Sequence, residues 1–224
     1  KIGTIFHTGD WKFDNNPQIG KSTNINILNK IAENGVLAVV GDSTNSMING
    51  KTESEKSVYD DIEKIIANAS GKVLFTCFSS NVARIKTIIN ASKLNNKHIV
   101  LAGKAIQRVV DVAQDLGYLN KNEVFLPINK INSVSNKELV IIASGSQGEP
   151  RSAMSRISQG KHEKINVLNG DTAVFSSSKI PGNELSIARV QDAFINQGIN
   201  VVTDEDALIH VSGHPGKADL IDLY

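Results

Sequence analysis

This chain of 224 residues has one cysteine, and it lacks proline-rich linkers and long apolar runs. Its single cysteine, Cys77, excludes an internal disulfide and suits a reducing compartment, so we predict a cytoplasmic protein with a buried structural thiol. No apolar run approaches the length of a membrane span and no secretory signal is visible, so we expect no membrane partner. Because repeats and low-complexity segments are also absent, composition marks no domain boundary.

An excess of either charge is missing too. The chain has 24 Lys and Arg against 23 Asp and Glu, and its net charge of +1 identifies no partner. A nucleic-acid surface would therefore have to arise from local clustering of basic residues. One basic run exists, and a solvated helix face is favoured over an RNA-binding surface for it; its members are Arg151, Arg156, Lys161, His162 and Lys164. With 40% hydrophobic and 21% charged residues, the composition is that of a soluble globular protein with one good core and part of a second.

Three familiar active-site motifs are absent. A hydrolase nucleophile elbow needs Gly-x-Ser-x-Gly, but Ser146 directly follows Gly145 and is out of register. The dinucleotide motif Gly-x-Gly-x-x-Gly does not occur. Gly20-Lys21-Ser22 resembles the end of a P-loop, but Asn15 occupies the position of the earlier glycine. These motifs therefore give no reason to expect an α/β-hydrolase, a dinucleotide-binding protein or a P-loop nucleotidase.

Short apolar runs alternate with segments of helical periodicity along the whole chain. Strands are expected at 2–6, 36–40, 72–78, 98–102, 123–126, 138–143 and 200–203, and helices at 24–34, 52–69, 82–94, 105–116 and 185–197. This alternation predicts an α/β fold with a parallel, doubly wound sheet and helices on both faces. In such sheets ligands bind beyond the carboxyl ends of the strands.

The stretch 140–156 combines an apolar run, a Ser/Gly turn and an expected helix start at Glu149-Pro150. Free backbone N–H groups, serine hydroxyls and a helix N-terminus would meet there, which suits a phosphate; a glycine-lined turn without a ligand fits the same residues. Small polar residues also follow other expected strands. The rim predicted in this way comprises Asp42, Ser79, Ser80, Asn81, Ser144, Ser146, Gln147, Ser176, Ser177 and Ser178.

Several histidines and carboxylates have two readings when taken alone. His7 and Asp10 follow the first strand and suit either metal ligation or a turn network, with the turn favoured. Asp42 caps the next helix or points into a site. His214 is a turn residue or a functional group, whereas His210 is favoured as a hydrogen-bonded structural histidine.

Six motifs occur along nearly the whole chain. They are His7-Thr8-Gly9-Asp10-Trp11-Lys12-Phe13-Asp14, Gly41-Asp42-Ser43-Thr44-Asn45, Phe78-Ser79-Ser80-Asn81, Ser144-Gly145-Ser146-Gln147-Gly148-Glu149-Pro150, Phe175–Ser178 with Ile180-Pro181-Gly182-Asn183-Glu184, and His210-Val211-Ser212-Gly213-His214. Each motif is weak alone, but together, in this order and at this spacing, they resemble the ribonuclease J family of metallo-beta-lactamase/beta-CASP nucleases. Departures from the family pattern remove no metal ligand. Ala83 replaces a histidine that would contact phosphate, and Pro215-Gly216-Lys217 puts the detailed 5′-phosphate pocket in question. Lys179 in place of a proline fits a surface turn.

The resemblance implies a domain layout. Residues 1–51 would end the first segment of a metallo-beta-lactamase αββα domain, 52–206 would form the inserted beta-CASP domain, and 207–224 would begin the returning segment. We expect both ends to be cut, with the family's His-x-His-x-Asp-His ligand run lying before Lys1 and a further metal-binding histidine after Tyr224.

The resemblance also implies site roles. Asp10 would bridge two metal ions, Asp42 would support the metal site, and His214 would act near the scissile phosphate. The implied activity is metal-dependent RNA hydrolysis, 5′-to-3′ exonucleolytic with some endonucleolytic cleavage, using two zinc ions or manganese. RNA with a 5′-monophosphate is the expected partner, the parent protein is expected to be a homo-oligomer, and this chain alone is expected to hold no metal and to be inactive. The residues expected to grip RNA or its phosphate are Ser79, Ser80, Asn81, Ser144, Gly145, Ser146, Gln147, Ser176, Ser177, Ser178, Ser212 and Gly213.

Two other functions fit parts of the sequence. A non-catalytic nucleotide- or RNA-binding α/β module would explain the polar rim without metals. A small-molecule hydrolase of the wider metallo-beta-lactamase type is disfavoured by the long insertion between Asp10 and His214. Trp11 and Phe13 would stack on bases in an RNA-binding protein, but core packing is favoured for both.

Overall fold

The computed structural model describes residues 2–224 and divides into two compact units. The first unit comprises Lys1–Lys56 and Val211–Tyr224, and the second comprises Ser57–His210. The two ends of the chain thus belong to one unit. Our sequence-based boundaries at 51 and 206 remain a prediction about domains of the whole protein.

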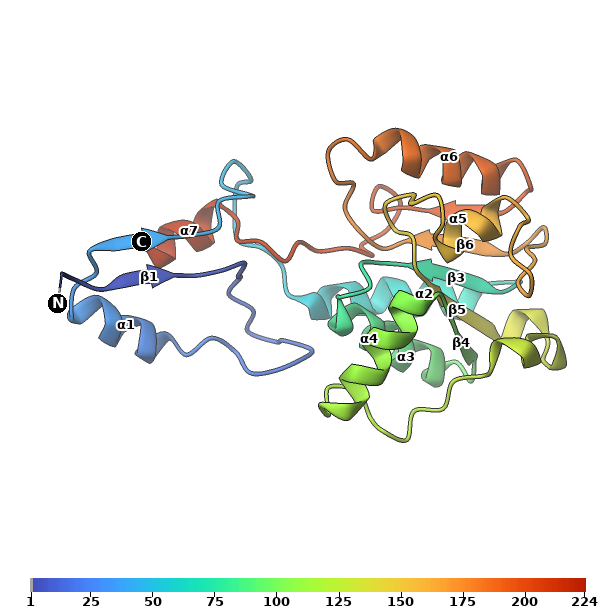
Figure 1. Cartoon of the computed structure of the whole chain (residues 1–224), viewed down its shortest axis with the longest axis horizontal. Helices are drawn as coiled ribbons and strands as arrows, with labels where there is room; N and C mark the ends of the chain where they lie inside the picture. Colours follow the sequence, from blue (N-terminus) through green and yellow to red (C-terminus); the bar gives the residue numbers. More distant parts are fainter. Residues whose placement is uncertain (1) are drawn as a thin grey trace. The chain divides into compact units, whose positions relative to one another are not determined.

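The second unit is built on a five-stranded sheet in the order β4-β5-β3-β6-β7 (Figure 1). The strands are β3 (Val73–Thr76), β4 (His98–Ala102), β5 (Leu139–Ala143), β6 (Thr172–Phe175) and β7 (Asn200–Val202). Every neighbouring pair is parallel. All residues of β3, β5 and β6 are buried, as expected for a parallel sheet covered on both faces. The predicted parallel α/β fold is confirmed.

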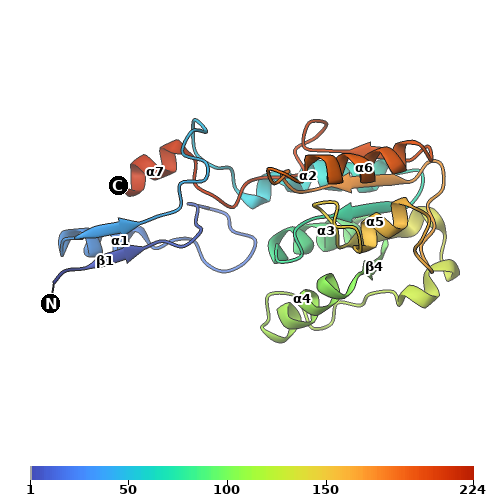
Figure 2. The same ribbon diagram turned by 45° about the horizontal axis from the view of Figure 1, so that its top comes forward.

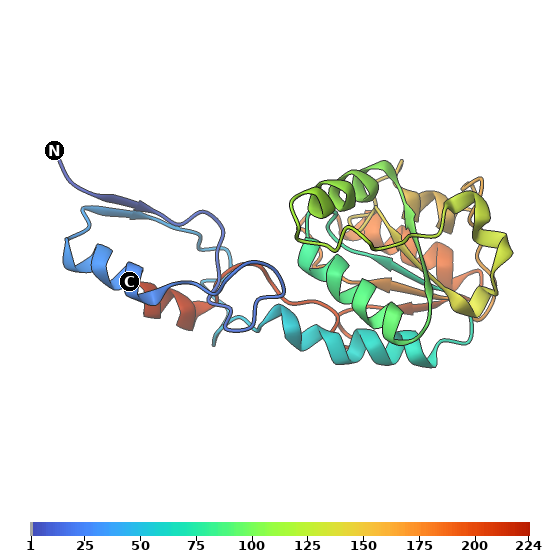
Figure 3. The ribbon, with the colours of Figure 1, turned by 90° about the horizontal axis from the view of Figure 1, so that it is seen from below.

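Helices cover both faces of this sheet. Helices α2 (Tyr59–Asn68) and α3 (Val82–Leu94) pack together on one side of the strands, and α6 (Glu184–Ile195) lies on the other side (Figure 3). The short α5 (Ala153–Ser158) lies beside α6 (Figure 2), and α4 (Lys104–Asp115) packs near β4 and α3. The rings of Phe175 and Phe194 meet edge to face at 6.5 Å in the core between β6 and α6. Among residues 2–224, none of the helices combines the length and apolar character that a membrane span needs.

The chain changes direction at β3, the central strand. After β3 it passes into α3 on one face, whereas after the neighbouring β5 and β6 it passes into α5 and α6 on the opposite face. Register pairs Thr76 with both Ala143 and Phe175, so these three strands end at the same level. Such a switch point is where open α/β sheets bind ligands.

The first unit contains the parallel pair β1 (Ile5–His7) and β2 (Ala38–Val40), with helices α1 (Ile25–Glu33) and α7 (Lys217–Leu223). Helix α1 starts where predicted because the Asn24 side chain accepts a hydrogen bond from the Ile27 N–H. The strand expected at 36–40 is present as β2, but the expectation that it is buried was wrong, since Val39 and Val40 are 40% and 50% exposed. In the described residues this sheet has only two strands.

Two other expectations were wrong. The helix expected at Glu149-Pro150 begins at Ala153, because the Ser152 side chain accepts the Ser155 N–H and caps it there, leaving Pro150 in a turn. Residues 123–126 are not a strand; next to β4 the Leu126 N–H donates to the Ile99 carbonyl at 2.8 Å, but no ladder forms. By contrast, α3 and β4 have the predicted bounds 82–94 and 98–102.

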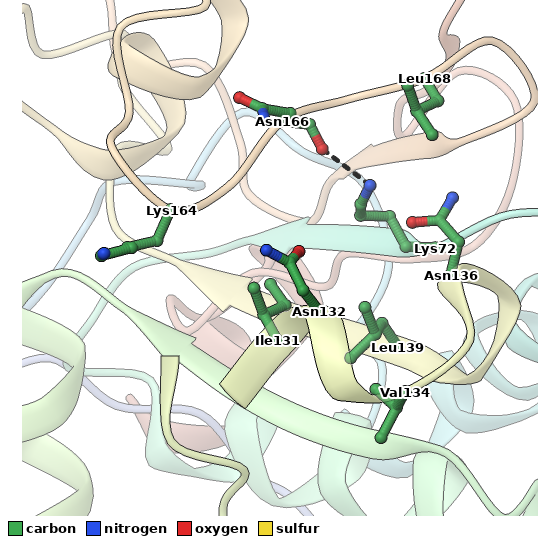
Figure 4. Close-up of a pocket in the computed structure, with 9 residues that line it drawn as sticks. All are labelled: Lys72, Ile131, Asn132, Val134, Asn136, Leu139, Lys164, Asn166 and Leu168. Atoms are coloured by element: carbon green, nitrogen blue, oxygen red, sulfur yellow. Dashed lines mark hydrogen bonds between the residues drawn. The ribbon is translucent and has the colours of Figure 1, made fainter. Parts of the chain in front are cut away.

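A buried ion pair fastens the amino ends of the strands. The Lys72 ammonium lies 2.9 Å from a carboxylate oxygen of Asp171, whose side chain is fully buried. Asp171 also accepts hydrogen bonds from the Asn136 amide and the Leu168 N–H. Lys72 further donates to the Asn166 carbonyl at 2.7 Å, at the edge of a pocket of about 310 Å³ (Figure 4). This ion pair joins the starts of β3 and β6 at the end of the sheet opposite the polar rim.

Candidate functional site

Three potential metal ligands meet in the first unit. One ligand atom each of Asp10, Asp42 and His214 lies within 4.8 Å of the others. Their convergence follows from the fold: β1 leads to Asp10 and β2 to Asp42, and the two parallel strands end in register at His7 and Val40. His214 is brought to these strand ends by the segment that enters the unit at Val211.

Asp42 and His214 form a hydrogen-bonded pair. The Nδ1 atom of His214 lies 2.7 Å from a carboxylate oxygen of Asp42, whose side chain is only 4% exposed. Burial acts to raise the pKa of Asp42, but hydrogen bonds from Thr44 and His214 outweigh it and lower that pKa below its usual range. The ionised carboxylate accepts a hydrogen, so His214 donates from Nδ1 and its Nε2 is left for another partner.

His7 and Asp10 make different contacts. The Nδ1 atom of His7 accepts the Gly9 N–H at 3.0 Å, which confirms the turn network for this histidine. Asp10 is exposed and its carboxylate lies with the Asp42–His214 pair. Trp11 and Phe13 are half-buried and pack edge to face with ring centroids 4.8 Å apart, as expected for packing residues.

In the second unit, the predicted polar residues after β3, β5 and β6 do lie at one end of the sheet, but many of their side chains are engaged. The side-chain oxygen of Asn81 caps α3 by accepting the Arg84 N–H at 2.9 Å. The Ser144 hydroxyl accepts the Ala153 N–H at 3.5 Å. Gly145 has a φ of +120°, and a side chain there would collide with Ser152. Local structure therefore uses the polar atoms of several of these residues.

The Gln147 side chain holds a loop in place. Its amide donates to the Ser178 carbonyl at 2.9 Å, and its carbonyl oxygen accepts the Ile180 N–H at 3.0 Å and the Asn183 amide at 3.3 Å. Gln147 thus orders residues 178–183 with both ends of its side chain. A role for this residue in phosphate binding stays a prediction.

The serines that follow β3, β5 and β6 differ in accessibility. Ser176 is buried and its hydroxyl donates to the Ile209 carbonyl at 2.6 Å. Ser146 and Ser177 are 4% and 6% exposed. Ser80 and Ser178 are exposed, and Ser79 and Ser144 are half-buried, so these four are the serines most open to a ligand.

Comparison with known proteins places these features in a family. A model described as the ribonuclease J beta-CASP domain matches residues 70–194, which is more than half of the chain. The chain belongs to the ribonuclease J family. Ribonuclease J of Sinorhizobium meliloti is 42% identical over the whole chain, that of Mycobacterium tuberculosis is 39% identical over 99% of it, and ribonuclease J2 of Bacillus subtilis is 36% identical over 98% of it. The chain spans 40% of the length of each of these relatives.

The structure shows a buried residue at this end of the sheet that the sequence analysis missed. Arg84 is fully buried in α3, and its guanidinium donates to the Ser176 hydroxyl and to the Ile209 carbonyl, each at 2.6 Å. It thereby ties the end of β6 to the segment that leaves the beta-CASP unit. The available signal was that Arg84 lies one turn before Ile88 on the buried face of its helix.

The basic run has mostly exposed side chains, as a solvated face requires: Arg151, Arg156, Lys161 and Lys164 are exposed. His162 differs, because it is half-buried and its Nδ1 atom accepts the N–H groups of Lys164 and Ile165 at 3.3 and 3.2 Å. Contact with RNA by this run stays a prediction.

His162 makes the stability of the chain depend on pH. Burial, helped by the nearby Arg156 guanidinium, lowers the pKa of His162 below its ordinary value of 6.5. The unfolded chain therefore binds a proton more readily than the native chain just below pH 6.5, and native stability falls as the pH drops through that range. Urea unfolding at pH 7.0 and pH 5.5 should show a larger loss for the wild type than for His162→Gln. Equal losses would show that His162 does not titrate differently on folding, and His98→Gln, at an exposed histidine, serves as the control.

Proposed function

We propose that this chain is the beta-CASP portion, with flanking metallo-beta-lactamase segments, of a metal-dependent ribonuclease. The proposed reaction is hydrolysis of RNA phosphodiester bonds, proceeding 5′ to 3′ as an exonuclease with some endonuclease activity. The observation that carries the proposal is the convergence of Asp10, Asp42 and His214 in a chain of the ribonuclease J family.

The donor set fits a divalent cation. Carboxylate oxygen and imidazole nitrogen are ligands that zinc and manganese accept. Asp10 is exposed and would hold the metal, bridging two zinc or manganese ions in the intact protein. Asp42 is already bonded to His214 and acts by orienting that imidazole. Of the three residues only Asp10 would hold the metal directly, which makes only part of a metal site, so we propose that the 224-residue chain alone is inactive.

Bound cations supply Lewis acidity, which lowers the pKa of water and offsets the negative charge that develops on the scissile phosphate. The residues of this chain supply orientation and a proton. Asp42 fixes the ring of His214 through Nδ1, so the opposite nitrogen faces away from the pair. From there His214 would donate a hydrogen bond to the reacting phosphate or a proton to the leaving oxygen.

RNA binding is proposed for the switch point of the second unit and for the segment before His214. Serine hydroxyls and backbone N–H groups there would contact the RNA backbone or a 5′-monophosphate without reading sequence. Ser79, Ser80, Ser144 and Ser178 are the most accessible serines after the strands, and Ser212 with Gly213 stands next to His214. We also propose a cytoplasmic, homo-oligomeric parent protein.

The test uses the intact protein that contains this chain and labelled RNA carrying a 5′-monophosphate. We expect processive loss of nucleotides from the 5′ end with zinc or manganese and none with a chelator, and negligible cleavage by the 224-residue chain. Binding of RNA by the intact protein without cleavage under any metal would instead favour a non-catalytic RNA-binding module. Strong cleavage by the isolated chain would contradict the incomplete metal site.

A further inference from the structure

The loop that carries His214 is held by Ser212 and Asn45, which belong to the family's motifs, and by Thr52, which lies outside them. The main chain of His214 is bonded on both sides: its N–H donates to the Ser212 hydroxyl at 3.1 Å, and its carbonyl accepts the Thr52 hydroxyl at 2.7 Å. Asn45 reinforces both contacts, since its amide donates to the Ser212 hydroxyl at 2.8 Å and to the His214 carbonyl at 3.4 Å.

Thr52 is itself fixed by a buried carboxylate. One oxygen of Asp219 accepts the Thr52 N–H at 2.8 Å and the Gly216 N–H at 3.1 Å, and Asp219 is fully buried. The Lys217 and Ala218 N–H groups donate to the carbonyls of Ile48 and Gly50, so residues 48–52 and 216–219 run against each other. A side chain at Gly216 would collide with the Gly50 carbonyl. The position of Thr52 is therefore determined from several directions.

The hydroxyl of Thr52 donates to the carbonyl of His214, the residue whose ring is bonded to Asp42. A change in the peptide of His214 moves its Cα and hence the aim of the imidazole. We propose that Thr52 is a positioning residue for His214, anchored by Asp219 and assisted by Asn45. This inference rests on the proposed role of His214 in RNA hydrolysis, but the positioning itself is a property of this chain.

The test compares Thr52→Val with Thr52→Ser in the intact protein. Valine keeps the shape of threonine and removes the hydroxyl, whereas serine keeps the hydroxyl that reaches the His214 carbonyl. We expect Thr52→Val to lower kcat for RNA hydrolysis by about 10- to 100-fold with KM little changed, as for a small misplacement of a reacting group. Thr52→Ser should recover most of this loss. Thr23→Val, at an exposed threonine, controls for the substitution itself.

A spectroscopic readout separates this inference from the proposed function. The Nδ1 proton of His214, held by Asp42, should give a downfield proton resonance in the wild type and in Thr52→Ser, and it should broaden or disappear in Thr52→Val. Normal kcat and an unchanged resonance in a folded Thr52→Val protein would overturn the inference. If the wild type cleaves no RNA, the proposed function fails, while the resonance still decides whether Thr52 positions His214.

Discussion

Replacing His214 with alanine in the intact protein is expected to lower kcat for RNA hydrolysis by about 100- to 10,000-fold, the range for loss of a general acid or base. The reason is that its Nδ1 atom is committed to Asp42 at 2.7 Å, leaving the other nitrogen for the phosphate. Initial rates on RNA with a 5′-monophosphate, at saturating metal and substrate, measure the effect.

Two further variants are compared with His214→Ala. Asp42→Asn keeps the size of the side chain but removes its charge. It should lower kcat by about 10- to 100-fold, because Asp42 acts through the orientation of His214. His98→Ala, at an exposed histidine of the other unit, should have no effect on kcat. A His214→Ala protein with wild-type kcat would remove this histidine from the proposed chemistry.

Replacing Asp171 with alanine is expected to lower the free energy of unfolding of the chain by about 3–5 kcal/mol, the usual cost of leaving one buried charge unpaired. The Lys72 and Asp171 side chains are 5% and 0% exposed, and Asp171 also receives backbone and amide hydrogen bonds at the starts of β3 and β6. Urea unfolding followed by circular dichroism measures the change.

An exposed ion pair gives the matched control. Lys179 and Glu205 lie 3.0 Å apart, like the buried pair, but their side chains are 41% and 78% exposed. Glu205→Ala should lower the free energy of unfolding by about 1 kcal/mol or less. If Asp171→Ala lowered the free energy of unfolding by as little as Glu205→Ala, Lys72 would be reaching water or another acceptor, and the ion pair would not anchor the sheet.

Segments whose pattern and caps agree were predictable from the sequence. Helix α3 has its cap at Asn81 and a continuous helical pattern to Leu94, and the structure has the same bounds. Residues 123–126 satisfied the strand pattern but make no ladder with β4. The helix expected at Glu149-Pro150 starts later, at Ala153, because the Ser152 side chain caps it; the sequence analysis took only Glu149-Pro150 as the start signal.

The site was harder to predict than the fold. From the residues alone, His7, Asp10 and His214 each fitted a turn and Asp42 fitted a helix cap, and only the family resemblance separated them. The contacts of Thr52 with His214 and Asp219 join positions 162 and 167 residues apart, so no local pattern could indicate them. The hydrogen bonds of Gln147 and Ser176 to distant loops are equally nonlocal.

The most direct test of the account is where metal binds in the intact protein. Anomalous diffraction from crystals containing manganese or zinc should show two peaks, both about 2.0–2.2 Å from the Asp10 carboxylate, with His214 beside them and its Nδ1 still bonded to Asp42. A metal site elsewhere, with Asp10 bonded to no ion in an enzyme that still cleaves RNA, would contradict the proposed centre.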